Sequence, residues 1–341
     1  KFFDGNGYKL PDEVEDELEK YVRQSADNEL ARPTGDGIGK IEFNSNLAHL
    51  YAHFVRHTID TSLEGLTIVY DGANGAASSV GPEILSGLGA KVININVNPD
   101  GLNINHHCGS THIEGLQVAV QQHNADLGIA NDGDADRCLL VDEKGQVLDG
   151  DQIMLLCALK LKEEGKLKGD TIVGTVMSNI GFHKAAEELG MKTVSTAVGD
   201  RYVLEYMREH NLSIGGEQSG HVIFLDHNTT GDGMLTAVQV AALMKEKNQP
   251  LSELASIMTK YPQVLLNVRV ATKTGWEDND LIKAAIVTAE GELGDEGRVL
   301  VRASGTEPLI RVMAEGPNQE ELQSLCQEIA DIIGREQGLA E

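Results

Sequence analysis

The stretch "LTIVYDGANGAASSVGPEILSGLGAKVINI" at residues 66–95 has the order of a strand, a loop, a helix and a second strand. A Thr-Ile-Val run comes first, and a loop rich in Gly and Asn follows it. A helical segment then ends at Leu-Gly, just before a second apolar run. A strand, a helix and a strand within this length predict a parallel βαβ unit.

A second stretch, "DTIVGTVMSNIGFHKAAEELGMKTVST" at residues 170–196, repeats this order. Both helical segments end in Leu-Gly-x-Lys, at residues 88–91 and 189–192. A Gly at that point suits the left-handed residue that commonly follows the last turn of a helix. The repetition predicts two consecutive domains of related fold.

Two other parts of the sequence do not follow the βαβ pattern. Residues 126–131, 137–141 and 146–148 have the composition of strands, and Asp-Glu-Lys-Gly at residues 142–145 is typical of a hairpin turn. The tail, from about residue 265, predicts the order β-α-β-β-α, with an apolar stripe along its final helix. An α+β module therefore ends the chain.

Composition limits the function. The 341 residues include 53 acidic and 28 basic side chains, a net charge of −25, which argues against partners such as nucleic acid or an anionic membrane. No apolar run is long enough to span a bilayer. The four cysteines are scattered without a C-x-x-C pair, which favours a reduced, cytoplasmic chain.

Carboxylates are densest in "NDGDADRCLLVDEKG" at residues 131–145, where Asp132, Asp134 and Asp136 precede Arg137. In a tight loop between two strands these carboxylates can converge, and Mg²⁺ or Ca²⁺ would offset their repulsion. A Mg²⁺ site keeps positions open for a phosphate oxygen, which Arg137 could bind as well. A solvated acidic turn is the alternative. An EF-hand is disfavoured because Arg137 occupies the position that requires Gly.

Two further loops carry polar groups. "GGEQSGHVIF" at residues 215–224 offers Glu217 and Ser219 to sugar hydroxyls, and His221 as a group that could move a proton at neutral pH. "TAVGDRYV" at residues 196–203 offers Asp200 and Arg201. Either stretch could also be an ordinary polar loop.

The segment "VRASGTEPLIRV" at residues 301–312 suits a phosphate that does not react. Hydroxyls, backbone N–H groups around a Gly and two cations are the groups that bind phosphate. An ordinary hairpin is the alternative. The candidate residues are Arg302, Ser304, Gly305, Thr306 and Arg311.

A zinc site is the other metal interpretation. His106, His107, Cys108 and His112 lie close together in sequence, but they lack the spacing of a tetrahedral site. Thr111 and Glu114 instead fit a capping box for the next helix.

Together, "DGDADR", "GEQSGH" and "RASGTEP", in this order, resemble the α-D-phosphohexomutase family. The segment "PDGLNIN…CGSTH" is most similar to the bacterial branch that acts on glucosamine phosphate. The resemblance implies an α/β fold with two consecutive related domains that have mixed sheets. A C-terminal α+β domain of the TATA-binding-protein-like kind follows them, and a remnant of a third α/β domain precedes them. The implied ranges are residues 1–43 for the remnant, 44–145 for the metal-loop domain, 146–259 for the sugar-loop domain and 263–341 for the phosphate-loop domain.

The resemblance also implies a reaction. A phosphoserine and a bisphosphorylated sugar would interconvert glucosamine 6-phosphate and glucosamine 1-phosphate, for UDP-N-acetylglucosamine and cell-wall precursor synthesis. The three aspartates would hold Mg²⁺, while Glu217 and Ser219 would bind a hexosamine phosphate. Arg137, His221 and Lys1 would lie near the reacting phosphate.

No Ser in the chain matches the family's nucleophile, so residues 1–341 alone are expected to be inactive. Three alternatives stay open: a phosphomannomutase, a phosphoglucomutase, or a non-catalytic Mg²⁺-dependent sugar-phosphate binding protein. A homodimer is also left open.

Overall fold

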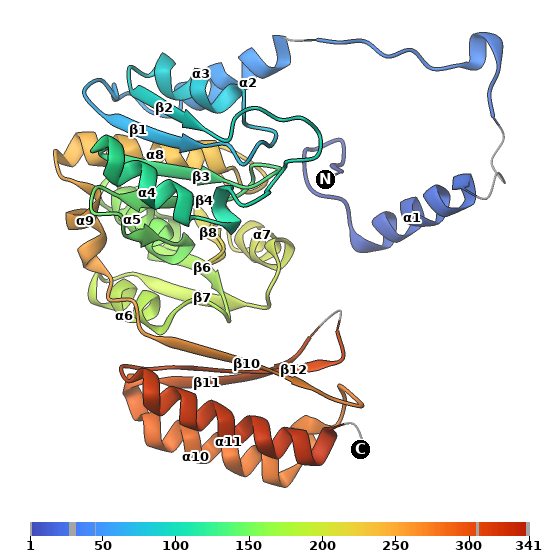
Figure 1. Cartoon of the computed structure of the whole chain (residues 1–341), viewed down its shortest axis with the longest axis vertical. Helices are drawn as coiled ribbons and strands as arrows, with labels where there is room; N and C mark the ends of the chain where they lie inside the picture. The colour runs from blue at the N-terminus through green and yellow to red at the C-terminus, as the bar shows by residue number, and fades with distance from the viewer. Residues whose placement is uncertain (1, 27–31, 45, 305–306, 339–341) are drawn as a thin grey trace. The chain divides into compact units, whose positions relative to one another are not determined.

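The protein is described by a computed structural model, which covers residues 2–26, 32–44, 46–304 and 307–338. The chain divides into two compact units. Figure 1 labels their helices and strands along the chain. The first contains residues 1–177 and 189–257, and the second contains residues 178–188 and 258–341.

The first sheet of the first unit has the strand order β2-β1-β3-β4-β5. Its central strand β1 (Thr67–Asp71) is parallel to β2 (Lys91–Ile95) and to β3 (Leu127–Asn131). Strands β4 (Cys138–Asp142) and β5 (Val147–Leu148) are antiparallel. The sheet is therefore mixed, and its hairpin turns at Gly145, which has a φ of +83°.

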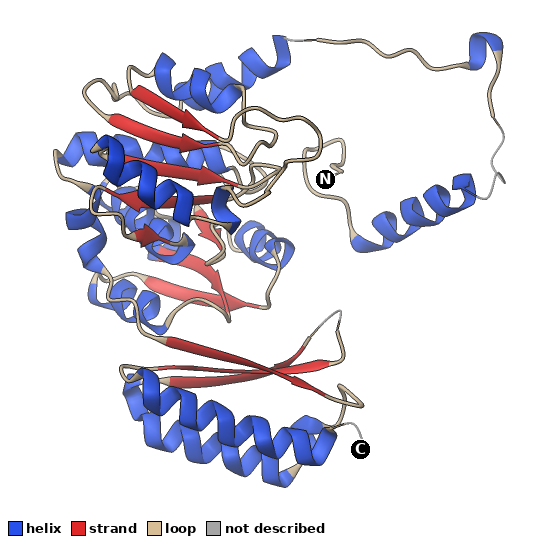
Figure 2. Ribbon diagram, viewed as in Figure 1, coloured by secondary structure: helices blue, strands red, loops and turns tan. Residues whose placement is uncertain are grey.

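The second sheet repeats this arrangement with the order β7-β6-β8-β9. Strand β6 (Thr171–Thr175) is parallel to β7 (Lys192–Thr196) and β8 (Ile214–Gly216), and β9 (Val222–Phe224) is antiparallel to β8. Figure 2 shows the strands of both sheets as arrows. The prediction of two consecutive related α/β domains with mixed sheets is confirmed.

Helices cover the sheets. On the first sheet, α4 (Glu114–His123) packs on β1, β3 and β4, and α8 (Gly233–Lys247) packs on β3 and β4. On the second, α7 (Asp200–Glu209) packs on β6, β7 and β8, and α5 (Gly150–Glu163) packs on β6 and β8. Helices α5 and α8 also contact each other. The remaining helices of the unit are α1 (Asp12–Ala26), α2 (Asn46–Arg56), α3 (Val80–Gly87) and α9 (Leu251–Leu254).

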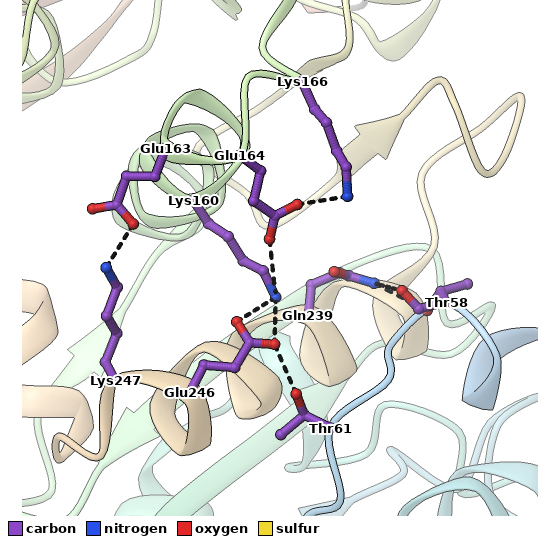
Figure 3. Close-up of polar contacts among 9 residues, drawn as sticks. All are labelled: Thr58, Thr61, Lys160, Glu163, Glu164, Lys166, Gln239, Glu246 and Lys247. Carbon is purple, nitrogen blue, oxygen red and sulfur yellow. Dashed lines mark hydrogen bonds and ion pairs between the residues drawn. The ribbon is translucent and has the colours of Figure 1, made fainter.

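A polar network joins α5 and α8 at one end (Figure 3). Lys160 lies 2.8 Å from Glu246 and 3.9 Å from Glu164. Thr61, which precedes β1, donates a hydrogen bond of 2.9 Å to Glu246. One acidic side chain thus connects both helices to the segment that enters the first sheet.

The second unit contains a three-stranded antiparallel sheet in the order β10-β12-β11. The strands are β10 (Gln263–Arg269), β11 (Arg298–Ala303) and β12 (Leu309–Glu315). Helices α10 (Asp280–Leu293) and α11 (Gln319–Gln337) pack on this sheet, and Asn279 and Asn318 cap their N-termini. Helix α6 (Ile180–Glu188) belongs to this unit as well. The predicted C-terminal α+β domain is confirmed.

Sequence signals for the ends of helices predicted the structure only in part. The glycines after the two Leu residues have φ values of +94° at Gly89 and +69° at Gly190, as a helix C-terminus requires. The predicted capping box before α4 is wrong, because Ile113 precedes the helix and no side chain caps it. Thr111 instead donates to the carbonyl of Cys108. None of the helices that the structure describes has the length and apolarity needed to cross a membrane.

Candidate functional site

The acidic loop connects the antiparallel strands β3 and β4. Its reversal places Ala135 at a φ of +60°. The carboxylates of Asp132, Asp134 and Asp136 each offer an oxygen within 4.8 Å of the others. Asp132 is buried, Asp136 is half-buried and Asp134 is exposed, so the group is open to solvent on one side. The predicted convergence in a loop between strands is what the structure shows.

The acidic loop is electrostatically costly without a cation. Burial raises the pKa of Asp132 to about 6, and the nearby charges of Asp136 and Asp134 add to the effect. An ion bound by all three oxygens would remove this repulsion. Three close carboxylate oxygens with an open side fit Mg²⁺, which prefers oxygen ligands and keeps positions for water or phosphate.

Buried polar contacts fix the shape of the acidic loop. The backbone N–H of Arg137 donates to Asp132 Oδ1 at 3.2 Å. Its carbonyl accepts a bond of 2.7 Å from Asn131, which is held in turn by the hydroxyl of Tyr70 at 3.0 Å. The N–H of Gly233, at the start of α8, donates to the carbonyl of Ala135 at 2.9 Å. A side chain at Gly233 would overlap Arg137 and Asn131, so only Gly permits this approach.

Backbone hydrogen bonds join the sugar loop, residues 217–221 between β8 and β9, to the first residue of β4, at the end of the acidic loop, and to the first residue of α5. The N–H of Cys138 donates to the carbonyl of Gly220 at 2.9 Å, and the N–H of Gly150 donates to that of Gln218 at 3.0 Å. A Cβ at Gly150 or Gly220 would lie within 2.4 Å of a facing carbonyl oxygen. Two segments that are about 80 residues apart in sequence are thus brought together by glycines.

The side chains of the sugar loop have different surroundings. His221 is 2% exposed, and its Nδ1 lies 3.4 Å from Asp136 Oδ2. Its Nε2 lies 3.8 Å from Asp200 Oδ2. Glu217 is half-buried and accepts a bond of 3.0 Å from the N–H of Gly199. Ser219 is exposed. The structure therefore brings His221 to the acidic loop, and it leaves Ser219 facing solvent.

Two cavities adjoin these loops. One of about 480 Å³ is lined by Asp134 and Asp136, and also by Tyr51 and Asp232, which the sequence did not single out. The hydroxyl of Tyr51 donates to Asp232 at 2.7 Å, and Asp232 caps the N-terminus of α8. Burial raises the pKa of the Tyr51 hydroxyl, so this group remains protonated. Neither residue of this pair was identified from the sequence.

A smaller cavity of about 140 Å³ lies beside His221. Asp200 and Arg201 line it, together with Lys9, which we did not identify from the sequence. Lys9 lies 3.6 Å from Asp200, and Arg201 donates to Glu205 at 2.8 Å. The two predicted residues are thus near the sugar loop, each with an ionic neighbour.

The phosphate-loop candidates lie in the second unit. Arg302 and Arg311 are directly paired across β11 and β12. Burial and the adjacent charge of Arg311 lower the pKa of Arg302, so an anion there would be stabilised. The carbonyl of buried Ser304 accepts a bond of 2.8 Å from Lys273, a third cation that was missed in the sequence. The predicted residues Lys1, Gly305 and Thr306 lie outside the described part of the chain.

The rival metal interpretations are not favoured. Strands, not helices, flank the acidic loop, which excludes an EF-hand. Within the described ranges, the three aspartates are the one set of three or more His, Cys, Asp or Glu residues with atoms close enough to hold an ion.

Three families of the phosphoglucomutase/phosphomannomutase group match the chain in order. They are alpha/beta/alpha domain II at residues 47–145, alpha/beta/alpha domain III at residues 149–261 and the C-terminal domain at residues 265–332.

Similar proteins carry a consistent name. A phosphoglucosamine mutase of Symbiobacterium thermophilum is 54% identical over 98% of this chain and 75% of its own length. One of Bacillus subtilis is 49% identical over 99% of this chain and 75% of its own length. The chain therefore spans about three quarters of these relatives.

Solved structures share the fold. A phosphoglucomutase/phosphomannomutase family protein of Burkholderia thailandensis has a TM-score of 0.74 at 20% identity, over 94% of this chain and 70% of its own. An N-acetylphosphoglucosamine mutase of Aspergillus fumigatus, solved with GlcNAc-6P and magnesium, has a TM-score of 0.68 at 22% identity, over 84% of this chain and 69% of its own. The matched domains, the sequence identity to bacterial phosphoglucosamine mutases and the shared fold agree, and the chain belongs to the phosphoglucomutase/phosphomannomutase family.

Proposed function

We propose that the chain is the metal-, sugar- and distal-phosphate-binding part of a phosphoglucosamine mutase, which interconverts glucosamine 6-phosphate and glucosamine 1-phosphate. The observation that carries the proposal is the pair of backbone hydrogen bonds that hold the sugar loop, from the N–H of Cys138 to Gly220 and from the N–H of Gly150 to Gln218. We call this pair the seam between the acidic loop and the sugar loop. It brings three converging carboxylates next to the loop that carries Glu217 and Ser219, for which we propose the role of sugar-hydroxyl acceptors. A metal-assisted phosphoryl transfer on a sugar needs these two groups side by side.

Asp132, Asp134 and Asp136 would hold Mg²⁺, which supplies charge neutralisation to a phosphoryl oxygen. Arg137, next to them, would bind the same phosphate through its forked donors. Glu217 and Ser219 would bind sugar hydroxyls, with Asp200 and Arg201 close by. Arg302, Ser304 and Arg311 would bind the phosphate that does not react. We also propose the four domain ranges given by the resemblance, a cytoplasmic location, and a role in cell-wall precursor synthesis.

Turnover requires a group that donates the phosphate. The aspartates and Arg137 stabilise charge on a phosphate, but they do not supply one. A polypeptide of residues 1–341 alone should therefore bind sugar phosphate without converting it. Phosphorus NMR should show no glucosamine 1-phosphate when this polypeptide is mixed with glucosamine 6-phosphate, Mg²⁺ and a bisphosphate primer. Clear turnover would mean that a nucleophile exists within these residues.

The metal assignment is tested with Mn²⁺, whose binding to the chain can be measured by electron paramagnetic resonance. Asp134→Asn should weaken Mn²⁺ binding at least about tenfold, because one of three charged ligands becomes neutral. Asp278→Asn is the matched control, since the Asp278 side chain is 95% exposed and far along the sequence from the acidic loop. Equal Mn²⁺ affinity in the two variants would contradict the assignment.

A further inference from the structure

The ring of His221 is enclosed on the side of Gly231. The N–H of Gly231 donates to His221 Nε2 at 3.1 Å. A Cβ at Gly231 would lie 2.4–2.6 Å from the ring atoms, so the backbone is packed directly against the imidazole. With 2% of the residue exposed, this ring has little freedom to turn.

The contact with Gly231 determines which ring nitrogen carries the proton. A nitrogen that accepts a hydrogen bond has no proton of its own, so in the neutral ring the proton is on Nδ1. Nδ1 is the nitrogen that lies 3.4 Å from Asp136 Oδ2. In the neutral ring the protonated nitrogen is therefore the one that lies beside a carboxylate of the acidic loop.

Each oxygen of Asp136 has a side-chain nitrogen of a neighbouring residue near it. Arg137 Nε lies 4.0 Å from Oδ1, and His221 Nδ1 lies 3.4 Å from Oδ2. The Asp136 side chain is 13% exposed, so both contacts are largely shielded from solvent. Donors outside a metal site orient its ligands and maintain their charge.

We propose that His221 is a positioning residue, which acts through Asp136 by donating from Nδ1 and does not exchange protons with the sugar. Its Nε2, the nitrogen nearer Asp200 and the smaller cavity, already accepts from Gly231. The inference rests on the proposed function, because it takes Asp136 to be a metal ligand. This positioning role replaces the proton-transfer role that we expected for His221 from the sequence.

Two variants of similar size separate the two ring nitrogens. In His221→Asn the amide nitrogen lies near the position of Nδ1, and in His221→Gln it lies near that of Nε2. Mn²⁺ dissociation constants are measured by electron paramagnetic resonance for the wild-type chain and both variants. We expect His221→Asn to remain within about threefold of wild type, and His221→Gln to bind on the order of 10–100-fold more weakly, as for other residues that support metal ligands.

A measurement without any variant accompanies this test. Nitrogen-15 NMR of the wild-type chain should show a protonated Nδ1 and an unprotonated Nε2 for the neutral ring of His221. The reverse tautomer would overturn the inference, and so would equal Mn²⁺ affinities for the Asn and Gln variants. Failure of the wild-type chain to bind Mn²⁺ would instead remove the proposed metal site itself.

Discussion

The pKa of Asp132 depends on the residues around it. Burial, together with two neighbouring carboxylates, raises its pKa to about 6, from 3.8 for an isolated Asp. The spacing of the three aspartates was visible in the sequence, and so was their convergence, because a short loop between two strands leaves little other space. The burial of Asp132 was not visible, since it depends on how other segments of the chain pack around the loop.

This shift gives a pH dependence without metal. The folded chain holds the Asp132 proton more tightly than the unfolded chain, so the stabilisation that this proton gives below pH 3.8 is lost as pH rises towards about 6. Asp132→Asn does not titrate. With a chelator present, its melting temperature relative to wild type should increase between pH 4 and pH 7. A relative melting temperature that decreased over this range would contradict the predicted sign.

The proposed sugar role of Glu217 and the proposed phosphate role of Arg311 can be separated by two substitutions. Arg311→Ala removes one of two paired cations, and it should weaken inorganic phosphate binding by about tenfold, or about 1.4 kcal/mol. Glu217→Ala removes an acceptor and should change phosphate affinity less than about twofold. Phosphate titration by calorimetry compares the two variants, and equal losses would argue against this division.

Partners from distant parts of the chain were beyond sequence reasoning. Lys273 contacts Ser304, and Tyr51 contacts Asp232 across 181 positions. No local pattern marks either Lys273 or Tyr51, because each lies in a segment whose own composition is ordinary. Such residues become visible only when the topology is known.

Among the elements, strands and short helices followed their sequence patterns more closely than the buried helix α8. The two βαβ units were recognisable because their Thr-Ile-Val strands and Leu-Gly helix ends repeat. Helix α8 is buried from Gly233 to Met244 on every side, so it has no polar face to give a helical period. A helix of this kind is hard to assign from periodicity alone.

The space around two helical glycines, Gly233 in α8 and Gly334 in α11, predicts that substitution by Ala has opposite effects on stability. Gly233→Ala would place a Cβ 2.3 Å from Arg137 O and Asn131 Nδ2, so it should destabilise the chain and disturb the acidic loop. Gly334→Ala, in α11, meets no atom within 4 Å and should stabilise the chain by up to about 1 kcal/mol. Thermal unfolding of both variants, with Mn²⁺ affinity as a second readout, tests this. Loss of metal affinity in Gly334→Ala would contradict the argument.

At the scale of the whole molecule, the two compact units do not follow the order of the chain. Residues 178–188, which come between β6 and β7 in sequence, belong with the C-terminal unit. Buried Glu315 at the end of β12 accepts bonds from the N–H of Ile180 at 3.0 Å and from Arg298 at 2.7 Å. The fold class was predictable from repeated motifs, but this grouping depends on a buried carboxylate that no pattern identified.

Glu315 should therefore be important to the second unit. Burial raises its pKa, while Arg298 opposes this effect, so the carboxylate depends on its partners to remain charged. Glu315→Ala removes the acceptor of the Ile180 N–H and of Arg298 Nε, while Arg298 keeps its bond to the Ser178 carbonyl, and the change should cost about 3 kcal/mol. Hydrogen exchange should increase both in residues 178–188 and in β12. Exposed Glu328 provides the control, and Glu328→Ala should leave exchange at both places unchanged.

The seam between the acidic and sugar loops has a consequence for how substrate preference can change. Its hydrogen bonds run from main chain to main chain, through Cys138, Gly150, Gln218 and Gly220. Substitutions at Gln218 or Ser219 would change what the loop presents to a sugar while keeping every one of these bonds. Under the proposed roles of the two loops, evolution can therefore explore new hexoses at residues 217–221, and a protein engineer can do the same, without rebuilding the acidic loop proposed to neutralise phosphate charge.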